Sequence, residues 1–261
     1  MNPAIKRSLL GASLLVSLAA SGQAAMLLAV DFNEINSTPV TSPTQSGFQA
    51  FNIDRGSNNT TSGARTANFT ASDASTITVN LPNGATISRD RGTGNGITNS
   101  GAFTYSDLYR DMAVHIIRNS PAVGGATPTL AQVQAATSMS LTGLNANRTY
   151  TIRLWSVNPG FDNNVVAEWF NLTPQTFAVQ GAETSLGTIT NLSASNPTSN
   201  TAFSILATVT SNQNGELYFR QSTPSGSGHF NGFELIPEPS SAMALVSSIA
   251  LLLGIRRRRT A

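Results

Sequence analysis

The sequence contains no cysteine, and its 261 residues include a single lysine, Lys6, two histidines and only 11% charged residues. Without cysteine the chain forms no disulfide and offers no thiolate to a metal, so its stability must come from packing. The residues between its two ends, about 210 of them, are enough for one well-buried core. Asn, Thr, Ser and Gly are abundant, which together with the low charge is typical of an extracellular β-protein.

The N-terminus has the pattern of a secretory signal peptide. Lys6 and Arg7 precede the apolar run "SLLGASLLVSLAA", and "SGQAA" supplies small residues for cleavage after Ala24 or Ala25. We therefore expect export through the secretion translocon and removal of residues 1–25 by signal peptidase. A retained transmembrane anchor is the alternative.

The C-terminal segment 236–261 combines a short charged motif, an apolar run over 242–255 and a cluster of arginines. The motif is Pro237, Glu238 and Pro239, and the cluster is Arg256, Arg257, Arg258 and Arg259. A helix over the apolar run is roughly 21 Å long, against a hydrocarbon core of roughly 30 Å, so it is a minimal transmembrane helix. The arginine cluster favours a cytoplasmic end, with the rest of the chain on the other side of the membrane.

These three features, in this order, resemble the PEP-CTERM sorting signal of Gram-negative bacteria. The resemblance implies an exosortase-like membrane enzyme that processes the tail near the Pro-Glu-Pro motif, often in bacteria that make exopolysaccharide. It also implies transient anchoring in the inner membrane, followed by a place at the cell surface or in the extracellular matrix.

Removing the two ends changes the charge of the chain. Between Met26 and Ile236 there remain nine arginines and twelve acidic residues, a net charge of about −3. The high isoelectric point thus comes from the targeting segments, and nucleic-acid binding loses its electrostatic basis.

Hydrophobic residues between the two ends recur with a period of two. "RTYTIRLWSVN" places Tyr150, Ile152 and Leu154 on one face and Arg153 and Trp155 on the other, as in a half-buried strand. Similar runs are "MLLAVDF", "GFQAFNI", "TITVNL", "SMSLTGL", "TFAVQG", "AFSILATVT", "GELYFRQ" and "FNGFELI". About nine strands separated by turn-forming residues predict an all-β, jelly-roll-like β-sandwich over 26–235.

One segment departs from this period. "SDLYRDMAVHIIRN" places Leu108, Met112 and then His115 or Ile116 at helical spacing, with Ser106 or Asp107 available as a cap. A strand through "MAVHII" fits nearly as well. A second short helix is expected over Thr129–Ala136.

The body of the chain also resembles a galactose-binding-like or malectin-like jelly roll of secreted bacterial proteins. The segments that carry this resemblance are, in order, "AVDFN", "GFQAFNID", "LTGLNANRTYTIRLWS" and "GSGHFNGFELI". The resemblance implies that "NGFELI" is a closing strand next to the N-terminal one. Such domains are commonly carbohydrate-binding modules, but a fold by itself does not assign that role.

Motifs for catalysis are weak. Ser227 lies between two glycines but lacks the spacing of a nucleophile elbow, and His115 and His229 are the only histidines. Glu168, flanked by an aromatic residue in "VVAEWFN", is the most suggestive acid for a glycan hydrolase or lyase. A solvated strand residue is the simpler interpretation of Glu168.

No metal or cofactor is expected. "DFNEIN" (31–36) and "GFDNN" (160–164) contain oxygen ligands that suit calcium, but an Asx-turn explains each of them.

Ligand binding is the function that the strand pattern favours. If Tyr150, Ile152 and Leu154 face the core, Trp155 and Arg153 lie on the outer face. The same reasoning buries Leu217 and Phe219 and turns Tyr218 and Arg220 outward. Exposed aromatic and arginine residues are typical of binding surfaces, unless a loop or the helical segment covers them.

The sequence therefore predicts an exported, tail-sorted surface or exopolysaccharide-matrix protein that acts as a non-catalytic carbohydrate-binding or adhesion module. A secreted glycan hydrolase or lyase is one alternative, which a cleft with converging carboxylates would favour. A structural or ice-adhesive surface protein is another, which a flat, regular threonine array would favour.

Overall fold

The computed structural model describes residues 25–35, 42–54, 65–82, 86–90, 97–115, 137–158, 165–173, 182–191, 197–223 and 228–238. Contacts group Met26–Ile236 into one compact unit. The expected signal peptide, the apolar run over 242–255 and the arginine cluster lie outside the described residues. No helix within the described ranges is long and apolar enough to cross a membrane.

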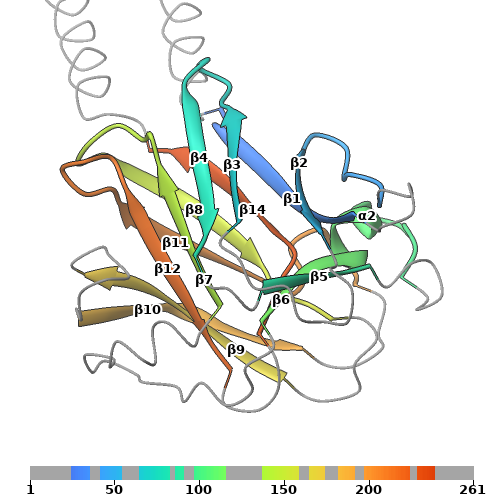
Figure 1. Ribbon diagram of the computed structural model, residues 1–261. Helices are drawn as coiled ribbons and strands as arrows, with labels where there is room; N and C mark the ends of the chain where they lie inside the picture. Colours follow the sequence, from blue (N-terminus) through green and yellow to red (C-terminus); the bar gives the residue numbers. More distant parts are fainter. Residues whose placement is uncertain are drawn as a thin grey trace, which may run out of the picture. The chain divides into compact units, whose positions relative to one another are not determined.

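Two large sheets form the body of this unit (Figure 1). Sheet A has the strand order β11 (Ser204–Thr210), β8 (Thr149–Trp155), β14 (Gly232–Pro237), β1 (Leu28–Ile35) and β2 (Gln49–Asp54). Sheet B has the order β10 (Ala182–Asn191), β9 (Val165–Thr173), β12 (Leu217–Ser222), β7 (Thr137–Thr142), β4 (Thr76–Leu81) and β3 (Arg65–Thr70). Most neighbouring strands pair antiparallel, whereas β1 and β2 pair parallel.

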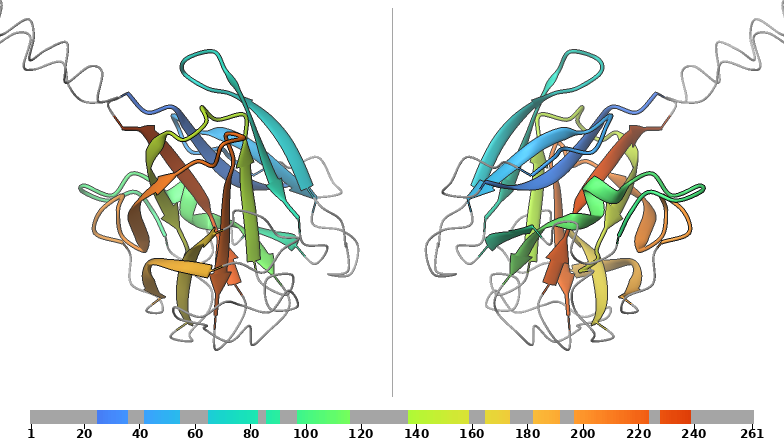
Figure 2. Two further views of the ribbon diagram at one scale, coloured as in Figure 1. Left: turned by 90° about the vertical axis from the view of Figure 1, so that its left-hand side faces the viewer. Right: turned by 90° about the vertical axis from the view of Figure 1, so that its right-hand side faces the viewer.

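A small third sheet and one helical turn complete the described elements. Sheet C has the order β13 (Gly228–Phe230), β6 (Asp111–His115) and β5 (Thr86–Asp90), and α2 (Ser106–Arg110) directly precedes β6. Figure 2 shows these elements from two further sides.

The core lies between sheets A and B. Alternate residues of their strands bury apolar side chains there, including Phe32 and Ile152 of sheet A and Val79 and Phe219 of sheet B, all at most 1% exposed. Burial of such side chains stabilises the fold by about 1.5–3 kcal/mol each. The fold is therefore a β-sandwich with almost no helix among its described residues, as the alternation predicts.

Buried Asn231, between β13 and β14, ties several strands together. Its Oδ1 accepts from the Val157 amide at 2.7 Å, its Nδ2 donates to the Asp111 carbonyl at 2.7 Å, and its carbonyl accepts from the Phe32 amide at 2.9 Å. Because every one of these groups is buried, losing the Asn231 side chain would leave polar atoms unpaired.

Most expected strands are present, and the expected neighbour of the N-terminal strand is correct. β1 pairs with β14, with Val30 opposite Phe233, as the jelly-roll resemblance implies. The alternation in β8 is also confirmed, because Tyr150, Ile152 and Leu154 are buried in the core. "TFAVQG" and Thr129–Ala136 lie outside the described residues.

The helical interpretation of 106–116 is correct for one turn only. α2 ends at Arg110, and the extended backbone of Asp111 (φ −108°, ψ 147°) starts β6, so Met112 belongs to a strand. The residue before the helix is Tyr105, which makes no side-chain cap, and the expected cap at Ser106 or Asp107 is wrong. In β6 the backbone groups pair with β5 and β13. A short isolated helix would not gain such backbone partners from neighbouring strands.

Candidate functional site

Trp155 is buried, so the expectation that its ring lies on the surface is wrong. It is 1% exposed and packs with Phe103, Leu108 and Tyr109, which come from the segment that contains α2. Its Nε1 donates to the Asn200 carbonyl at 2.9 Å. The ring does lie on the outer face of β8, as predicted, but this helical segment covers it.

Arg153, two residues earlier on the same face, is partly exposed and held by neighbours. Its Nε lies 3.6 Å from Glu234 Oε2, and its guanidinium lies 5.8 Å from the centre of the Trp155 ring. The Tyr105 hydroxyl donates to the other Glu234 oxygen at 3.3 Å. Burial raises the pKa of Glu234, and Arg153 and Tyr105 oppose this shift.

Arg220 is fully buried, so its predicted exposure is also wrong. Its Nη2 donates to Glu183 Oε2 at 2.7 Å, and its guanidinium lies 4.9 Å from the centre of the Phe170 ring. A buried guanidinium requires such partners, because an unpaired charge in the interior is very costly. Tyr218 is half-buried, and its hydroxyl donates to Glu216 at 3.4 Å.

The four predicted contact residues do not form one groove. Arg153 and Trp155 belong to β8 of sheet A, whereas Tyr218 and Arg220 belong to β12 of sheet B. Cross-strand pairing places Tyr218 beside Ser140 of β7.

The residues considered for catalysis do not converge either. Glu168 accepts from the Ser185 hydroxyl at 2.6 Å, and the neighbouring rings of Trp169 and Phe170 are fully buried, so they offer no sugar platform beside it. His229 is buried, with its Nε2 2.9 Å from Asn158 Nδ2. Ser227 and the side chain of His115 are outside the part of the chain that the structure describes.

Within the described ranges, no group of three or more His, Cys, Asp or Glu side chains could hold a metal ion. Asp31 and Asn33 belong to β1 and are buried, so the Asx-turn interpretation of this segment is wrong. Asp31 Oδ2 accepts from the Gln45 amide at 2.7 Å, and burial raises the pKa of Asp31 to about 7. Residues 160–164 lie outside the described ranges.

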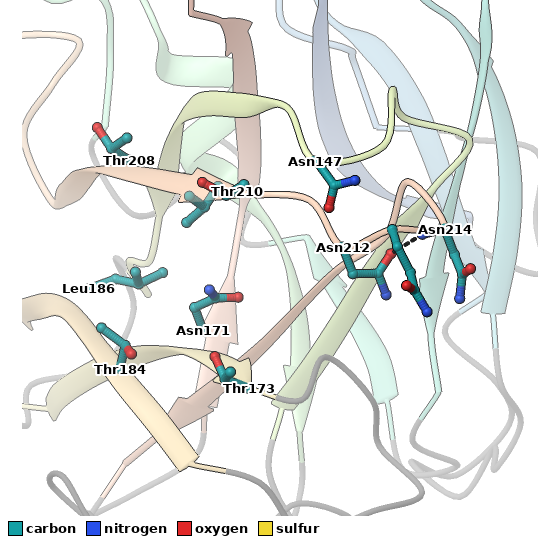
Figure 3. A pocket seen from close by; sticks show the side chains of 11 residues that line it. Asn147, Asn171, Thr173, Thr184, Leu186, Thr208, Thr210, Asn212 and Asn214 are labelled. Carbon is teal, nitrogen blue, oxygen red and sulfur yellow. Dashed lines mark hydrogen bonds between the residues drawn. The ribbon is translucent and has the colours of Figure 1, made fainter.

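A polar hollow lies where an edge of sheet A meets an edge of sheet B (Figure 3). It has a volume of about 700 Å³ and is open to solvent. Five side-chain amides, four threonine hydroxyls and two aliphatic side chains line it: Asn147, Asn171, Asn212, Gln213, Asn214, Thr173, Thr184, Thr208, Thr210, Leu186 and Val209. None of these side chains is charged.

Five segments supply this lining. β9 and β10 contribute from sheet B, β11 contributes from sheet A, and two turns contribute Asn147 and the residues 212–214. In Figure 3 the labelled side chains of all five segments are arranged around the hollow. The site therefore exists only when the edges of both sheets come together.

The turn over 211–216 is a rigid part of the wall. Asn212 Oδ1 accepts from the amides of Asn214 and Glu216, each at 2.9 Å, and its Nδ2 donates to Glu216 Oε2 at 2.9 Å. The backbone N–H of Asn147 donates to the backbone carbonyl of Asn212 at 3.1 Å, so the two turns are joined. Because these bonds hold the backbone of both turns, it loses little conformational entropy when a ligand binds.

Side-chain amides and hydroxyls both donate and accept hydrogen bonds, so such a lining complements a ligand that carries many hydroxyl groups. Partly exposed Leu186 adds apolar area beside the polar groups, whereas the Val209 side chain is buried in the core. The absence of charge among the lining residues gives no particular attraction to an anion.

The hollow could not be predicted from the sequence. Its members are small polar residues that lie up to 67 positions apart, from Asn147 to Asn214, and share no motif.

No protein-family model and no curated protein matches this chain. Among solved structures, it is similar to the CBM22-1 xylan-binding domain of Xyn10C from Paenibacillus barcinonensis, with 7% identity, a TM-score of 0.33 and coverage of 84% of this chain and 99% of that one. A Clostridium thermocellum xylanase 10B fragment with CBM22-1 and GH10 modules gives 8% identity and a TM-score of 0.32, over 59% of this chain and 25% of the xylanase chain. TmCBM61, solved with β-1,4-galactotriose, gives 10% identity and a TM-score of 0.27, over 70% and 97%. These neighbours include carbohydrate-binding modules, but the similarity is too low to assign a family or a ligand.

Proposed function

We propose that the protein is a non-catalytic carbohydrate-binding module that contacts an uncharged polysaccharide through the hollow between β9, β10 and β11. The observation that carries this proposal is the lining, in which nine of the eleven residues carry a side-chain amide or hydroxyl and no side chain is charged. Each sugar hydroxyl both donates and accepts a hydrogen bond, and the amides of Asn147, Gln213 and Asn214 can do the same. Partly exposed Leu186 suits the C–H face of a sugar ring.

Affinity at one such site is expected to be weak. The hollow has no aromatic side chain in its lining, so stacking of a sugar on a ring contributes nothing there. An extended polysaccharide nevertheless presents many equivalent sugars, and multiple weak contacts give strong retention.

A glycan array with the purified protein tests the proposal. Wild-type protein should bind one or more neutral oligosaccharides in preference to uronate-containing or sulfated ones. Thr184→Ala combined with Asn214→Ala should reduce this binding at least tenfold, because both exposed side chains line the hollow. Asn52→Ala, which removes an exposed amide from β2 of sheet A, should leave it unchanged.

Two results would reject the proposal. Unaltered binding by the double variant would place the glycan elsewhere. Release of reducing sugar from a bound polysaccharide, abolished by Glu168→Gln, would show that the protein is an enzyme.

We also propose that the protein is exported and sorted through its tail. Support comes from the signal-peptide pattern of residues 1–25 and from the Pro-Glu-Pro motif, apolar run and arginine cluster of 236–261. Intact-mass measurement of the native protein should give a chain without the residues Arg256, Arg257, Arg258 and Arg259. Changing Pro237 and Pro239 to alanine should leave the precursor in the membrane, whereas released protein with a complete C-terminus would contradict sorting.

A further inference from the structure

The hairpin of β3 and β4 carries a ladder of uncharged polar side chains on its outer face. Its three cross-strand pairs are Thr66 with Asn80, Asn68 with Thr78, and Thr70 with Thr76. Phe69, Ile77 and Val79 on the other face are buried in the core. The apolar face thus fixes which side of the hairpin presents the ladder.

Hydrogen bonds fix the orientation of two of these pairs. Thr66 Oγ1 donates to Asn80 Oδ1 at 3.0 Å, and Thr78 Oγ1 donates to Asn68 Oδ1 at 2.8 Å. The threonine hydrogens are therefore used within the ladder. The Nδ2 groups of Asn68 and Asn80 have no partner among the residues that the structure describes, so each pair offers amide donors and a threonine oxygen as an acceptor.

The ladder continues across sheet B toward Tyr218. Thr78 lies opposite Thr142 of β7, Asn80 lies opposite Ser140, and Ser140 in turn lies opposite Tyr218 of β12. One row across four strands thus runs from exposed Thr66 through Asn80 and buried Ser140 to the half-buried Tyr218 ring. Asparagine and serine interrupt the threonines, so this is not the regular threonine array of an ice-adhesive surface.

The ladder and the hollow lie at opposite edges of sheet B. The hollow is lined from β10 and β9, and the ladder stands on β4 and β3, with β12 and β7 between them. With neighbouring strands about 4.8 Å apart, β9 and β4 are separated by roughly 15 Å. A short oligosaccharide in the hollow therefore leaves the ladder accessible to a second chain.

We propose that the outer face of the β3–β4 hairpin is a second contact surface for uncharged glycan, so that one molecule links two polysaccharide chains. This inference rests on the proposed function, because it assigns the same class of ligand to a separate surface. An uncharged glycan fits this surface because the ladder side chains carry no charge. Their amide donors alternate with hydroxyl acceptors, and each glycan hydroxyl can accept from one and donate to the other. An anionic chain would find no cation in this ladder.

Nuclear magnetic resonance of the full chain labelled with ¹⁵N-asparagine tests both surfaces at once. The probes are the short oligosaccharides xylotriose, cellotriose and laminaritriose, added separately. A probe that binds should shift the side-chain amide signals of Asn68 and Asn80 as well as those of Asn147 and Asn214. The signal of Asn52 on β2 should stay in place, and asparagine-to-alanine variants assign each signal.

Variants separate the two surfaces. Asn68→Ala with Asn80→Ala should reduce affinity at the ladder at least tenfold while changing affinity at the hollow less than twofold. Thr184→Ala with Asn214→Ala should do the reverse. Wild-type protein should also precipitate or thicken a long, soluble xylan, cellulose derivative or laminarin that it binds, and either double variant should lose this cross-linking.

The possible outcomes distinguish this inference from the proposed function. Shifts confined to Asn147 and Asn214 would overturn the second surface and leave the hollow as the binding site. Shifts confined to Asn68 and Asn80 would overturn the hollow and the linking of two chains. Absence of shifts with all three trisaccharides would overturn both.

Discussion

Arg220 on β12 and Glu183 on β10 form a charge pair with Nη2 and Oε2 2.7 Å apart, and both side chains are inaccessible to solvent. Phe170, from the strand between them, lies against the guanidinium. This charge pair links the edge strand β10, which lines the hollow, to β12 in the middle of sheet B.

Replacing Glu183 with alanine should therefore destabilise the protein strongly. The change leaves the guanidinium of Arg220 buried without its carboxylate partner, and losses of about 3–5 kcal/mol are usual in such cases. Urea denaturation of the purified protein measures the free energy of unfolding. Glu183→Leu combined with Arg220→Met should recover most of the loss, because no charge is then buried; a loss below 1 kcal/mol in Glu183→Ala would contradict the pairing.

Trp155→Ala should also destabilise the protein, by about 3–5 kcal/mol, because it empties a buried site between β8 and the segment around α2. It also leaves the Asn200 carbonyl without the indole donor. Denaturant unfolding provides the measurement. Leu206→Ala on the neighbouring strand is the control, since this side chain is 55% exposed and its loss should cost less than about 1 kcal/mol. Equal, small effects of both changes would mean that Trp155 is not packed.

Trp155 and Arg220 show what alternation in a sequence can predict and where it stops. It correctly gives the two faces of β8 and β12, because side chains in a strand must point alternately to opposite sides. It does not say whether a distant segment covers the outer face. Phe103 and Tyr109, about 50 residues before Trp155, provide such a cover, and no local pattern connects them with β8.

The hollow and the ladder were harder to predict for a related reason. Thr184 and Asn214 lie on different elements, and only the meeting of two sheet edges brings them to one hollow. Likewise, Asn68 and Asn80 read as ordinary polar residues until the register of β3 and β4 pairs each with a threonine. Chemistry that depends on long-range strand pairing leaves little local signal.

The buried carboxyl of Asp31 should make stability depend on pH. Its pKa rises from an ordinary 3.8 to about 7, mainly because burial disfavours the charged form, while Asp107 adds repulsion and the Gln45 amide opposes the shift. The folded protein therefore holds a proton that the unfolded chain has already released. The contribution of this group to stability should be complete below about pH 4 and should be lost as the pH rises to about 7, a change of about 4 kcal/mol.

Asp31→Asn isolates this effect, because the asparagine cannot ionise and its oxygen can still accept from the Gln45 amide. Urea denaturation between pH 4 and pH 8 should give a flatter profile for the variant than for the wild type. The variant should also be the more stable of the two at pH 8. Parallel profiles would show that Asp31 does not titrate in this range.

Gly215 couples the fold to the hollow, and Gly215→Ala should damage both. Its φ is +72°, and an added Cβ would collide with the Leu144 carbonyl oxygen, so the turn over 211–216 must move. We expect a loss of about 2 kcal/mol or more in the free energy of unfolding, and weaker glycan binding at Asn147 and Asn214. Binding at the Asn68 and Asn80 surface should be unchanged.

Gly47→Ala is the matched control for this change. Gly47 also has a positive φ, +87°, but no atom lies within 4 Å of the position that its Cβ would take. It therefore introduces only the backbone strain, about 1 kcal/mol, and it precedes β2, which is at the opposite edge of sheet A from β11. If Gly47→Ala weakens glycan binding as much as Gly215→Ala does, the loss reflects general destabilisation; if only Gly215→Ala weakens it, the rigid turn is what positions the amides of the hollow.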